Sequence, residues 1–365
     1  MKELVPEFYS KFKCIASQCT DSCCIGWEID IDSRTSNFYR SIDGTFADSI
    51  EKNIAWEEPP HFILTSEERC PFLNKDNLCE IFIHLGEEHL CEICTEHPRF
   101  HEWFGDYKES GLGLCCEEAV RLLYSQDHPL TFTLQEIDEQ PDEADFDQNI
   151  LQHLLNVRTH LFHILQNDQL CFAERLKALL HQAELIQELL DNEEYDALEK
   201  LITSDPQKIS PADFSIQKTV QDISYILSFL TELEPIDPQW PHRLDDLAKQ
   251  LPVLTKLESC EPLREYEHLA VYFLFRYFLK GIWDGDILSR TKLAVLAPLM
   301  IRLLAKQTFS KTHTLSIKQR IDNTKAFSKE IEYCEENLEA LLCKSWEVSC
   351  LSVETLCNMA DCLFS

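Results

Sequence analysis

The distribution of cysteine constrains this chain more than any other feature of its sequence. Of 17 cysteines, ten lie at or before Cys116 and seven are scattered over the rest of the chain. Residues 1–13 lack the apolar run that a signal peptide needs. We therefore expect a cytosolic protein whose cysteines are reduced thiols. Because the apolar runs of the first region are short, we also expect loops that carry metal ligands to hold this region together.

The early cysteines form two groups along the sequence. Thiolates a few residues apart can converge on one centre, and soft ligands of this kind select zinc, copper(I) or an iron–sulfur cluster. The spacings lack the paired C-x2-C motifs of a zinc ribbon, and Gly26 stands where a radical-SAM loop would need its third cysteine. Spacing alone leaves iron–sulfur and zinc both open. The first group is Cys14, Cys19, Cys23 and Cys24; the second is Cys70, Cys79, Cys91, Cys94, Cys115 and Cys116.

Other candidate ligands have simpler interpretations. Histidines near the cysteine groups are expected to be surface or hydrogen-bonded residues rather than ligands; they are His84, His89, His97 and His101. Cys343, Cys350 and Cys357 recur every seven residues, so we expect them to share one helix face and pack in a core as small hydrophobic side chains. We expect the same of the isolated later cysteines, Cys171, Cys260, Cys334 and Cys362.

The net charge of −31 excludes several classes of partner. So acidic a chain repels nucleic-acid phosphate and anionic membrane surfaces, and it attracts basic partners. With eight glycines and no G-x-G-x-x-G or P-loop sequence, a Rossmann-type nucleotide site is not expected. The longest apolar stretches, Leu269–Leu279 and Leu293–Leu304, are too short to span a bilayer. We therefore expect neither a nucleic-acid nor a membrane partner.

The pattern of apolar residues changes after the cysteine groups. Residues 125–147 are polar and acidic, and they predict a linker or solvated loop. Beyond them, apolar residues fall on one face at spacings of three and four, as in Ile150–Ile164 and Leu176–Leu190. We predict a mainly α protein: an irregular cysteine-rich, metal-binding region over 1–124, with short strands at Trp27–Asp32 and His61–Thr65, and an all-α domain over 148–365.

The cysteine blocks resemble the N-terminal part of the flagellin lysine-N-methylase family. The resemblance runs over residues 12–121, and the aromatic run His268–Ile282 and Leu161–Leu180 are similar to later segments of that family. A shorter form of the pattern also occurs in zinc- or iron-chelating proteins. The matching blocks are Phe12–Asp32, Cys70–Leu73, Leu78–Ile81, Leu85–Glu87, Cys94–Arg99 and Leu114–Ala119.

The resemblance implies a function and a set of ligands. It implies methyl transfer from S-adenosylmethionine to lysines of a flagellin-like protein, with an iron–sulfur cluster, of the 4Fe-4S type, or zinc as the alternative. A non-enzymatic zinc- or iron-binding protein and a redox or scaffold protein are the competing hypotheses. His97 and Glu117 depart from the family pattern, Cys91 and Cys115 stand where serine is usual, and Glu87 and Glu118 are expected to be surface acids. The implied ligands are Cys14, Cys19, Cys23, Cys24, Cys70, Cys79, Cys94 and Cys116.

Overall fold

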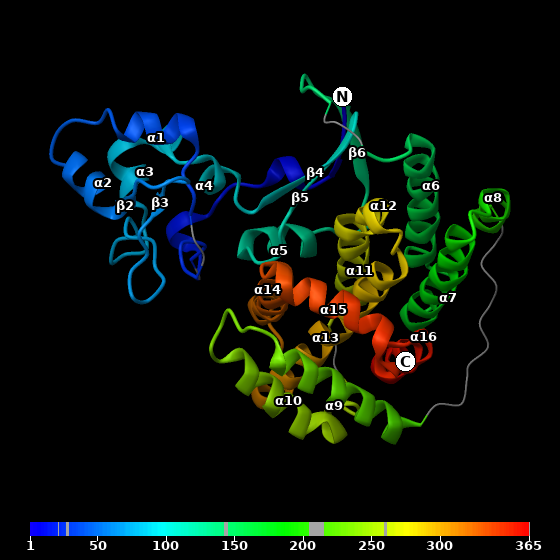
Figure 1. Ribbon diagram of the computed structural model, residues 1–365. Coiled ribbons are helices and arrows are strands. Elements are labelled where there is room, and N and C mark those ends of the chain that lie inside the picture. The colour runs from blue at the N-terminus through cyan, green and yellow to red at the C-terminus, as the bar shows by residue number, and fades with distance from the viewer. Residues whose placement is uncertain (21, 27–28, 142–144, 204–214, 259–260, 365) are drawn as a thin grey trace.

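A computed structural model describes residues 1–20, 22–26, 29–141, 145–203, 215–258 and 261–364. The expectation of a mainly α protein is confirmed. Trp27 and Glu28, the start of one predicted strand, and Cys260 lie outside the described residues. Figure 1 shows a small lobe at one end of the molecule, built from α1 to α4, and a larger body of helices at the other.

Helices form the body where the sequence predicts them. In α6 (Gln148–Leu165) the apolar face buries Leu154, Val157 and Leu161, and Asp147 caps the first turn by accepting a hydrogen bond from the Asn149 N–H. α7 (Phe172–Asp191) packs against α6 in the same way. The remaining helices of the body are α8 (Tyr195–Ile202), α9 (Ile216–Glu232), α10 (Trp240–Leu254), α11 (Leu263–Tyr277), α12 (Gly281–Asp284), α13 (Leu288–Thr312), α14 (Ile317–Glu332), α15 (Glu335–Glu347) and α16 (Val353–Phe364).

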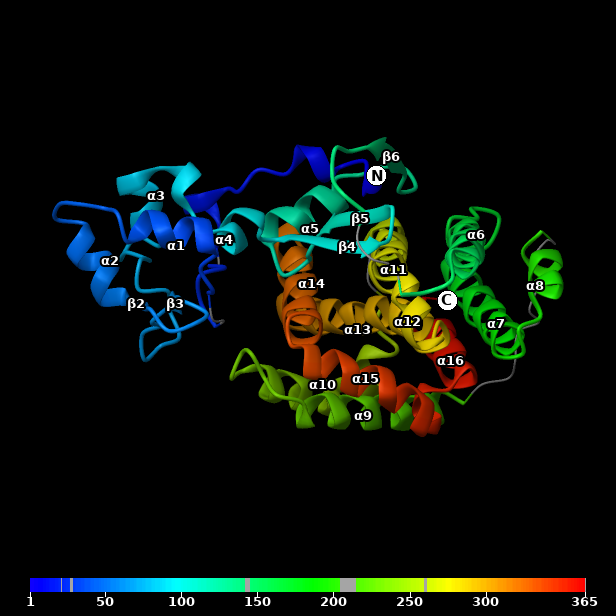
Figure 2. The ribbon, with the colours of Figure 1, turned by 45° about the horizontal axis from the view of Figure 1, so that its top comes forward.

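Helix α13 is the centre of this body. Every residue from Leu288 to Gln307 is buried, and the helix contacts α7, α10, α11, α14, α15 and α16. A helix covered on all sides has no solvent face, which explains why its sequence lacks a polar stripe. In Figure 2 the other helices surround it on several sides.

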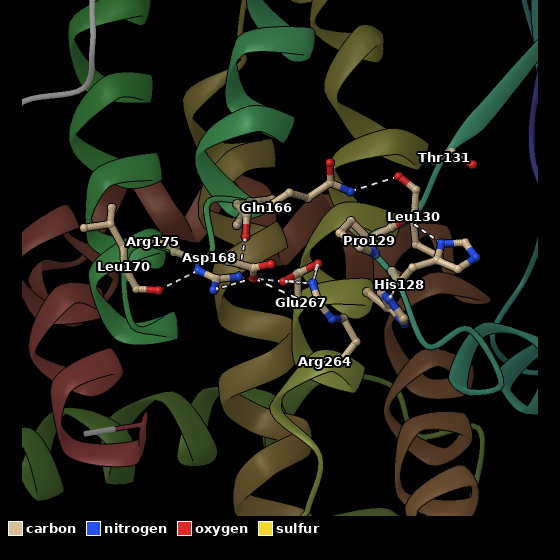
Figure 3. Close-up of polar contacts among 12 residues, drawn as sticks. His128, Pro129, Leu130, Thr131, Gln166, Asp168, Leu170, Arg175, Arg264 and Glu267 are labelled. Carbon is tan, nitrogen blue, oxygen red and sulfur yellow. Dashed lines mark hydrogen bonds and ion pairs between the residues drawn. The ribbon is translucent and has the colours of Figure 1, made fainter.

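Charged side chains tie α6, α7 and α11 together at one end of the body (Figure 3). Arg175 of α7 and Arg264 of α11 both bind the carboxylate of Glu267, at 2.6 and 2.7 Å, and Arg175 also reaches Asp168 at 3.0 Å. The Gln166 side chain donates a hydrogen bond of 2.9 Å to the Leu130 carbonyl. The segment before α6 is thereby fixed to the helices.

A four-stranded sheet packs against the body, and the sequence pattern does not predict it. Its order is β4 (Arg99–Phe104), β5 (Tyr107–Leu112), β1 (Lys2–Pro6), β6 (Phe132–Glu136). β1 is parallel to β5, while β4–β5 and β1–β6 are antiparallel. The sheet is joined to α6 by a buried ion pair in which Arg158 donates to Glu109 at 2.7 Å, with the Tyr107 hydroxyl donating to the same carboxylate at 2.6 Å.

The small lobe has its own apolar core. Ile29, Ile31, Ile50, Phe62 and Phe72 are among its buried members, whereas Phe8, Phe104 and Leu114 belong to the core of the body. The strands β1, β4 and β5 and helix α5 therefore pack with the helices, although they precede the predicted boundary at 124. The boundaries at 124 and 147 stay predictions. The lobe contains α1 (Ser33–Tyr39), α2 (Ala47–Asn53), β2 (Ile54–Ala55), β3 (His61–Phe62), α3 (Glu80–Leu85) and α4 (Glu92–Glu96), and α5 (Glu117–Tyr124) lies between β5 and β6 in the chain.

Three local predictions need correction. The acidic segment 125–147 is not loop throughout, because Phe132–Glu136 pairs with β1. The predicted strand at His61–Thr65 is reduced to His61–Phe62, and Trp27–Asp32 contributes one bridge, Asp30 to His61, among its described residues. Cys343, Cys350 and Cys357 do not share one helix, since a break at Val348–Ser352 separates α15 from α16; Cys350 and Cys357 are buried, while Cys343 and Cys171 are exposed.

Candidate metal centre

Five cysteines meet in the core of the lobe and form what we call the inner thiol set: Cys24, Cys70, Cys79, Cys91 and Cys94. The Cys70 N–H donates to the Cys24 carbonyl at 2.8 Å, and Leu73 pairs with Cys79 across a short turn. Cys91 and Cys94 flank the start of α4, and their sulfur atoms are 3.2 Å apart. Four separate segments thus bring thiols into one apolar core.

The inner thiols influence one another electrostatically. Burial raises the pKa of Cys70 to about 12, and negative charge on Cys24, Cys79 or Cys91 would raise it further. The pKa of Cys94 is raised, first by its hydrogen bond with Cys91 and then by burial. The hydrogen bond from Cys23 instead lowers the pKa of Cys24 to about 7. Cys70, Cys79 and Cys94 therefore resist ionisation, whereas the pKa of Cys91, like that of Cys24, is lowered by the hydrogen bond with its neighbouring cysteine. A bound cation would favour the thiolate form of all five.

Four further cysteines form an outer thiol set where the chain leaves the sheet for α5: Cys14, Cys19, Cys23 and Cys116. Burial raises the pKa of Cys116 to about 11, and charges on Cys19 and Cys14 act in the same direction. The Cys19 thiol donates to Glu117 over 3.7 Å, and the Thr20 N–H donates to the same carboxylate at 2.9 Å. Glu117, at the start of α5, thus fixes the loop that carries Cys19.

The structure regroups the cysteines relative to the sequence. Cys24 leaves the first sequence group for the inner set, and Cys116 leaves the second for the outer set. The adjacent pair Cys23–Cys24 therefore joins the two sets, and Gly26, with φ of +85°, turns the chain immediately after them. Cys91, which the resemblance set aside, lies inside the inner set.

Cys115 faces a different environment from Cys116. Its sulfur lies 4.0 Å from Nε2 of His97 and is hydrogen-bonded with Tyr333 of the body, and burial raises its pKa to about 12. Burial also lowers the pKa of His97 to about 4. Arg276 lies nearby, paired with Glu332 at 3.0 Å. Cys115 thus connects the cysteine region to the helices rather than to either thiol set.

The other candidate histidines have hydrogen-bonding or packing partners. His84 binds Glu80 at 3.0 Å, His101 binds Ser110 at 2.7 Å, and His89 stacks on Phe38. The expectation of hydrogen-bonded or surface histidines is therefore met by these three residues.

The two acids expected on the surface differ. Glu87 is exposed as expected, but Glu118 is buried, with its carboxylate bound to Arg121 through two hydrogen bonds of 2.6 and 2.5 Å. Glu118 is therefore occupied within its own helix.

The donor chemistry of both thiol sets fits a thiolate-bound metal centre, because soft sulfur ligands favour zinc and iron–sulfur clusters. In the described part of the chain, however, no three histidine, cysteine or acidic side chains are arranged around one point as a metal ion would require. The thiols are close enough to shift one another's pKa without forming a finished coordination sphere. We therefore assign no metal from geometry.

Comparison with known proteins gives the class of the chain. The FliB lysine N-methylase C-terminal domain matches residues 158–359, which covers α7 to α15, the second part of α6 and most of α16. The chain thus belongs to the FliB lysine N-methylase family, and the expected class, a protein-lysine N-methylase, is confirmed at that level.

Individual relatives match over 140 residues, or 35% of this chain. The flagellar biosynthetic protein FliU of Salmonella muenchen is 32% identical over 82% of its length. The Lysine-N-methylases of Salmonella typhimurium and Salmonella choleraesuis are 31% identical, and the matched part spans about a third (34%) of each. No solved structure matches this fold significantly. Among the described residues, no helix is long and apolar enough to cross a membrane.

Proposed function

We propose that this protein transfers methyl groups from S-adenosylmethionine to lysine side chains of a flagellin-like protein. The observation that carries the proposal is the match of the helical body, residues 158–359, to the FliB lysine N-methylase C-terminal domain. The name of the relative FliU, a flagellar biosynthetic protein, supports a flagellar substrate. The net charge of −31 suits a substrate that presents lysines.

The reaction needs a neutral lysine. The ε-ammonium group first loses a proton to a base, and its nitrogen then attacks the methyl carbon of the donor. The new C–N bond forms as the C–S bond breaks, leaving S-adenosylhomocysteine and a methylated ammonium. A desolvated site lowers the lysine pKa and favours this deprotonation. We assign the base to no residue.

The proposal includes an iron–sulfur cluster, with zinc as the alternative. Cys14, Cys19, Cys23 and Cys116 would hold one centre, and Cys24, Cys70, Cys79 and Cys94 another. A bound cluster would neutralise thiolates and cross-link the loops that carry them. The residues of the chain itself position these thiols: Glu117 holds the Cys19 loop, and Asp32 accepts N–H bonds from Thr35 and Glu92 at the starts of α1 and α4.

The methylase activity is tested by incubating purified protein with flagellin and S-adenosylmethionine and measuring the intact mass of flagellin. We expect increments of one methylene mass per transfer. The mass must stay constant without the methyl donor. A flagellin mass that never changes, with protein purified both with and without oxygen, contradicts the proposed activity.

The metal is tested on protein purified without oxygen, by its visible spectrum and its iron, sulfide and zinc content. We expect broad visible absorption with iron and sulfide. Cys70→Ser should remove metal from the inner set alone, and Cys116→Ser from the outer set alone. Cys171→Ser, which changes an exposed cysteine on the body, is the matched control. A colourless protein containing zinc contradicts the cluster and favours the zinc alternative.

A further inference from the structure

A cavity of about 300 Å³ lies between α14 and the start of α10, together with the loop that precedes α10. Its wall carries three basic side chains, Arg243, Lys325 and Lys329, and three acidic ones. Trp240 supplies an aromatic part of the wall. A cavity of this size can enclose much of a small organic ligand.

The acidic groups of the wall already have donors. The Glu330 carboxylate accepts the N–H groups of Ile236 and Asp237, at 2.9 and 2.7 Å. The Asp237 carboxylate accepts the Gln239 N–H at 2.9 Å, just before α10 begins. Asp322 is paired with Lys318 at 3.1 Å. These acids hold the loop and the helix surface in place.

Two of the basic groups lack such a partner. Within the described ranges, neither Arg243 nor Lys329 forms an ion pair, and Arg243 donates from Nη2 to the amide oxygen of Asn323 at 2.5 Å. A guanidinium carries five N–H donors, so further donors of Arg243 remain for a ligand. Burial lowers the pKa of Arg243, which reflects how little water surrounds it. The three bases of the wall are balanced by its three acids, and Asp237 and Asp322 act on Arg243 to raise its pKa. An anion would therefore be bound by the spare N–H donors of Arg243 and Lys329 rather than by a net positive charge.

The cavity also lies beside the outer thiol set. A side chain on Gly26 would come within 3.8 Å of Ile236, in the loop that lines the cavity. Lys325, in the cavity wall, acts with Thr20 and Lys318 to lower the pKa of Glu117 despite its partial burial. In Figures 1 and 2 the loop before α10 extends toward the cysteine lobe. All the lining residues fall within 158–359, the segment that matches the methylase domain.

We infer that this cavity binds the carboxylate end of an amino-acid-bearing small molecule, with Arg243 and Lys329 as its anion-binding residues. The inference rests on the proposed function, under which that molecule is the methyl donor. A planar guanidinium pairs with a carboxylate through two parallel hydrogen bonds, which fixes orientation as well as charge. Trp240 provides an apolar wall for the rest of the ligand.

The test compares two ligands that differ at the carboxylate. S-Adenosylhomocysteine carries it, whereas 5′-methylthioadenosine keeps the nucleoside and thioether but lacks the amino-acid end. Calorimetry on the full-length protein should show that Arg243→Gln and Lys329→Gln weaken S-adenosylhomocysteine binding about 10- to 100-fold. Binding of 5′-methylthioadenosine should change less than about threefold, since neither side chain then loses a partner.

Lys249→Gln is the matched control, because it removes a charge from α10 at an exposed position. It should leave both affinities unchanged. Arg243→Lys should retain part of the affinity for S-adenosylhomocysteine, because it keeps the charge but not the paired geometry. Thermal melting of each variant checks folding, and Lys329→Gln decides the test if Arg243→Gln does not fold.

The outcomes separate this inference from the proposed function. If the unmodified protein binds S-adenosylhomocysteine and the two cavity variants bind it equally well, the cavity assignment is overturned while the methylase activity stands. If the variants bind S-adenosylhomocysteine and 5′-methylthioadenosine more weakly by the same factor, the carboxylate assignment is overturned. If the unmodified protein neither binds S-adenosylhomocysteine nor methylates flagellin, the inference and the proposed function fall together.

Discussion

The buried ion pair between Glu109 and Arg158 predicts a large loss of stability when one partner is removed. The two residues are 3% and 2% exposed, and the guanidinium also donates to the Phe275 carbonyl at 3.2 Å. Arg158→Met keeps the bulk of the side chain but leaves the Glu109 carboxylate buried without its cation. Breaking a pair of this kind costs about 3–5 kcal/mol.

Urea unfolding followed by circular dichroism measures this cost. Typical domains are stable by about 5–15 kcal/mol, so Arg158→Met should lower the unfolding midpoint substantially. Lys249→Met is the control: its ion pair with Asp246 is exposed, and its loss should cost less than about 1 kcal/mol. The double variant Arg158→Met with Glu109→Leu should lose less unfolding free energy than the two single variants lose together, because it leaves no charge buried without a partner. A single-variant loss below about 1 kcal/mol would refute the reasoning.

Three further predictions concern pH, packing and capping. Burial lowers the pKa of His268 to about 4, so between its ordinary value of about 6.5 and pH 4 the unfolded state binds a proton that the folded state does not. The unfolding free energy should therefore fall by up to about 3 kcal/mol as pH drops through that window. Urea titrations at several pH values should show a weaker dependence of unfolding free energy on pH for His268→Gln. An equally strong dependence would show that another group causes the effect. A Cβ at Gly113 would lie 1.8 Å from the Tyr333 hydroxyl oxygen, so Gly113→Ala should cost about 1–3 kcal/mol in thermal unfolding, and a Tyr333→Phe background that gave no relief would count against this contact. Asp32 accepts N–H bonds of 2.9 Å from Thr35 and from Glu92, so Asp32→Ala should cost about 1–2 kcal/mol and speed proteolysis within the lobe, whereas Asp43→Ala, in a loop of the same lobe, should not.

The helices of the body could be predicted because their apolar residues repeat at the period of a helix. α6 and α7 both bury the faces that the spacing of three and four indicates. The break between α15 and α16 was missed because a seven-residue repeat of cysteine continues across it. A repeat in sequence places residues on one face only while the helix continues.

The sheet could not be predicted from local pattern. β5 reads Tyr-Lys-Glu-Ser-Gly-Leu, and Lys108, Glu109 and Ser110 are buried despite being polar. Their burial is compensated by partners from distant parts of the chain, such as Arg158 for Glu109. The residues next to β5 in the sequence do not indicate these distant partners. The alternation of apolar and polar residues that predicts a strand is therefore absent.

The cysteines illustrate the same limit at the candidate site. Sequence proximity placed Cys24 with Cys14 and Cys116 with Cys70, but folding exchanges these two residues between the sets. The family resemblance implies which cysteines are ligands, whereas their division into two sets depends on loop geometry that spacing does not encode. In the sequence Glu117 is only a departure from the family pattern, yet in the structure it anchors the loop that carries Cys19.

The parallel pairing of β1 with β5 has a consequence for the order in which the chain can fold. Lys2 pairs with Tyr107, so β1 cannot pair with β5 until about a hundred further residues, including the whole cysteine lobe, have been synthesised. The lobe is in effect an insertion between two adjacent strands, and it leaves a ribosome before the sheet can close. The cysteines of the inner thiol set all precede β5, so this set can begin to assemble while the amino-terminal strand is still unpaired. The outer set needs Cys116, which follows β5, and closure of the sheet then joins the lobe to the body.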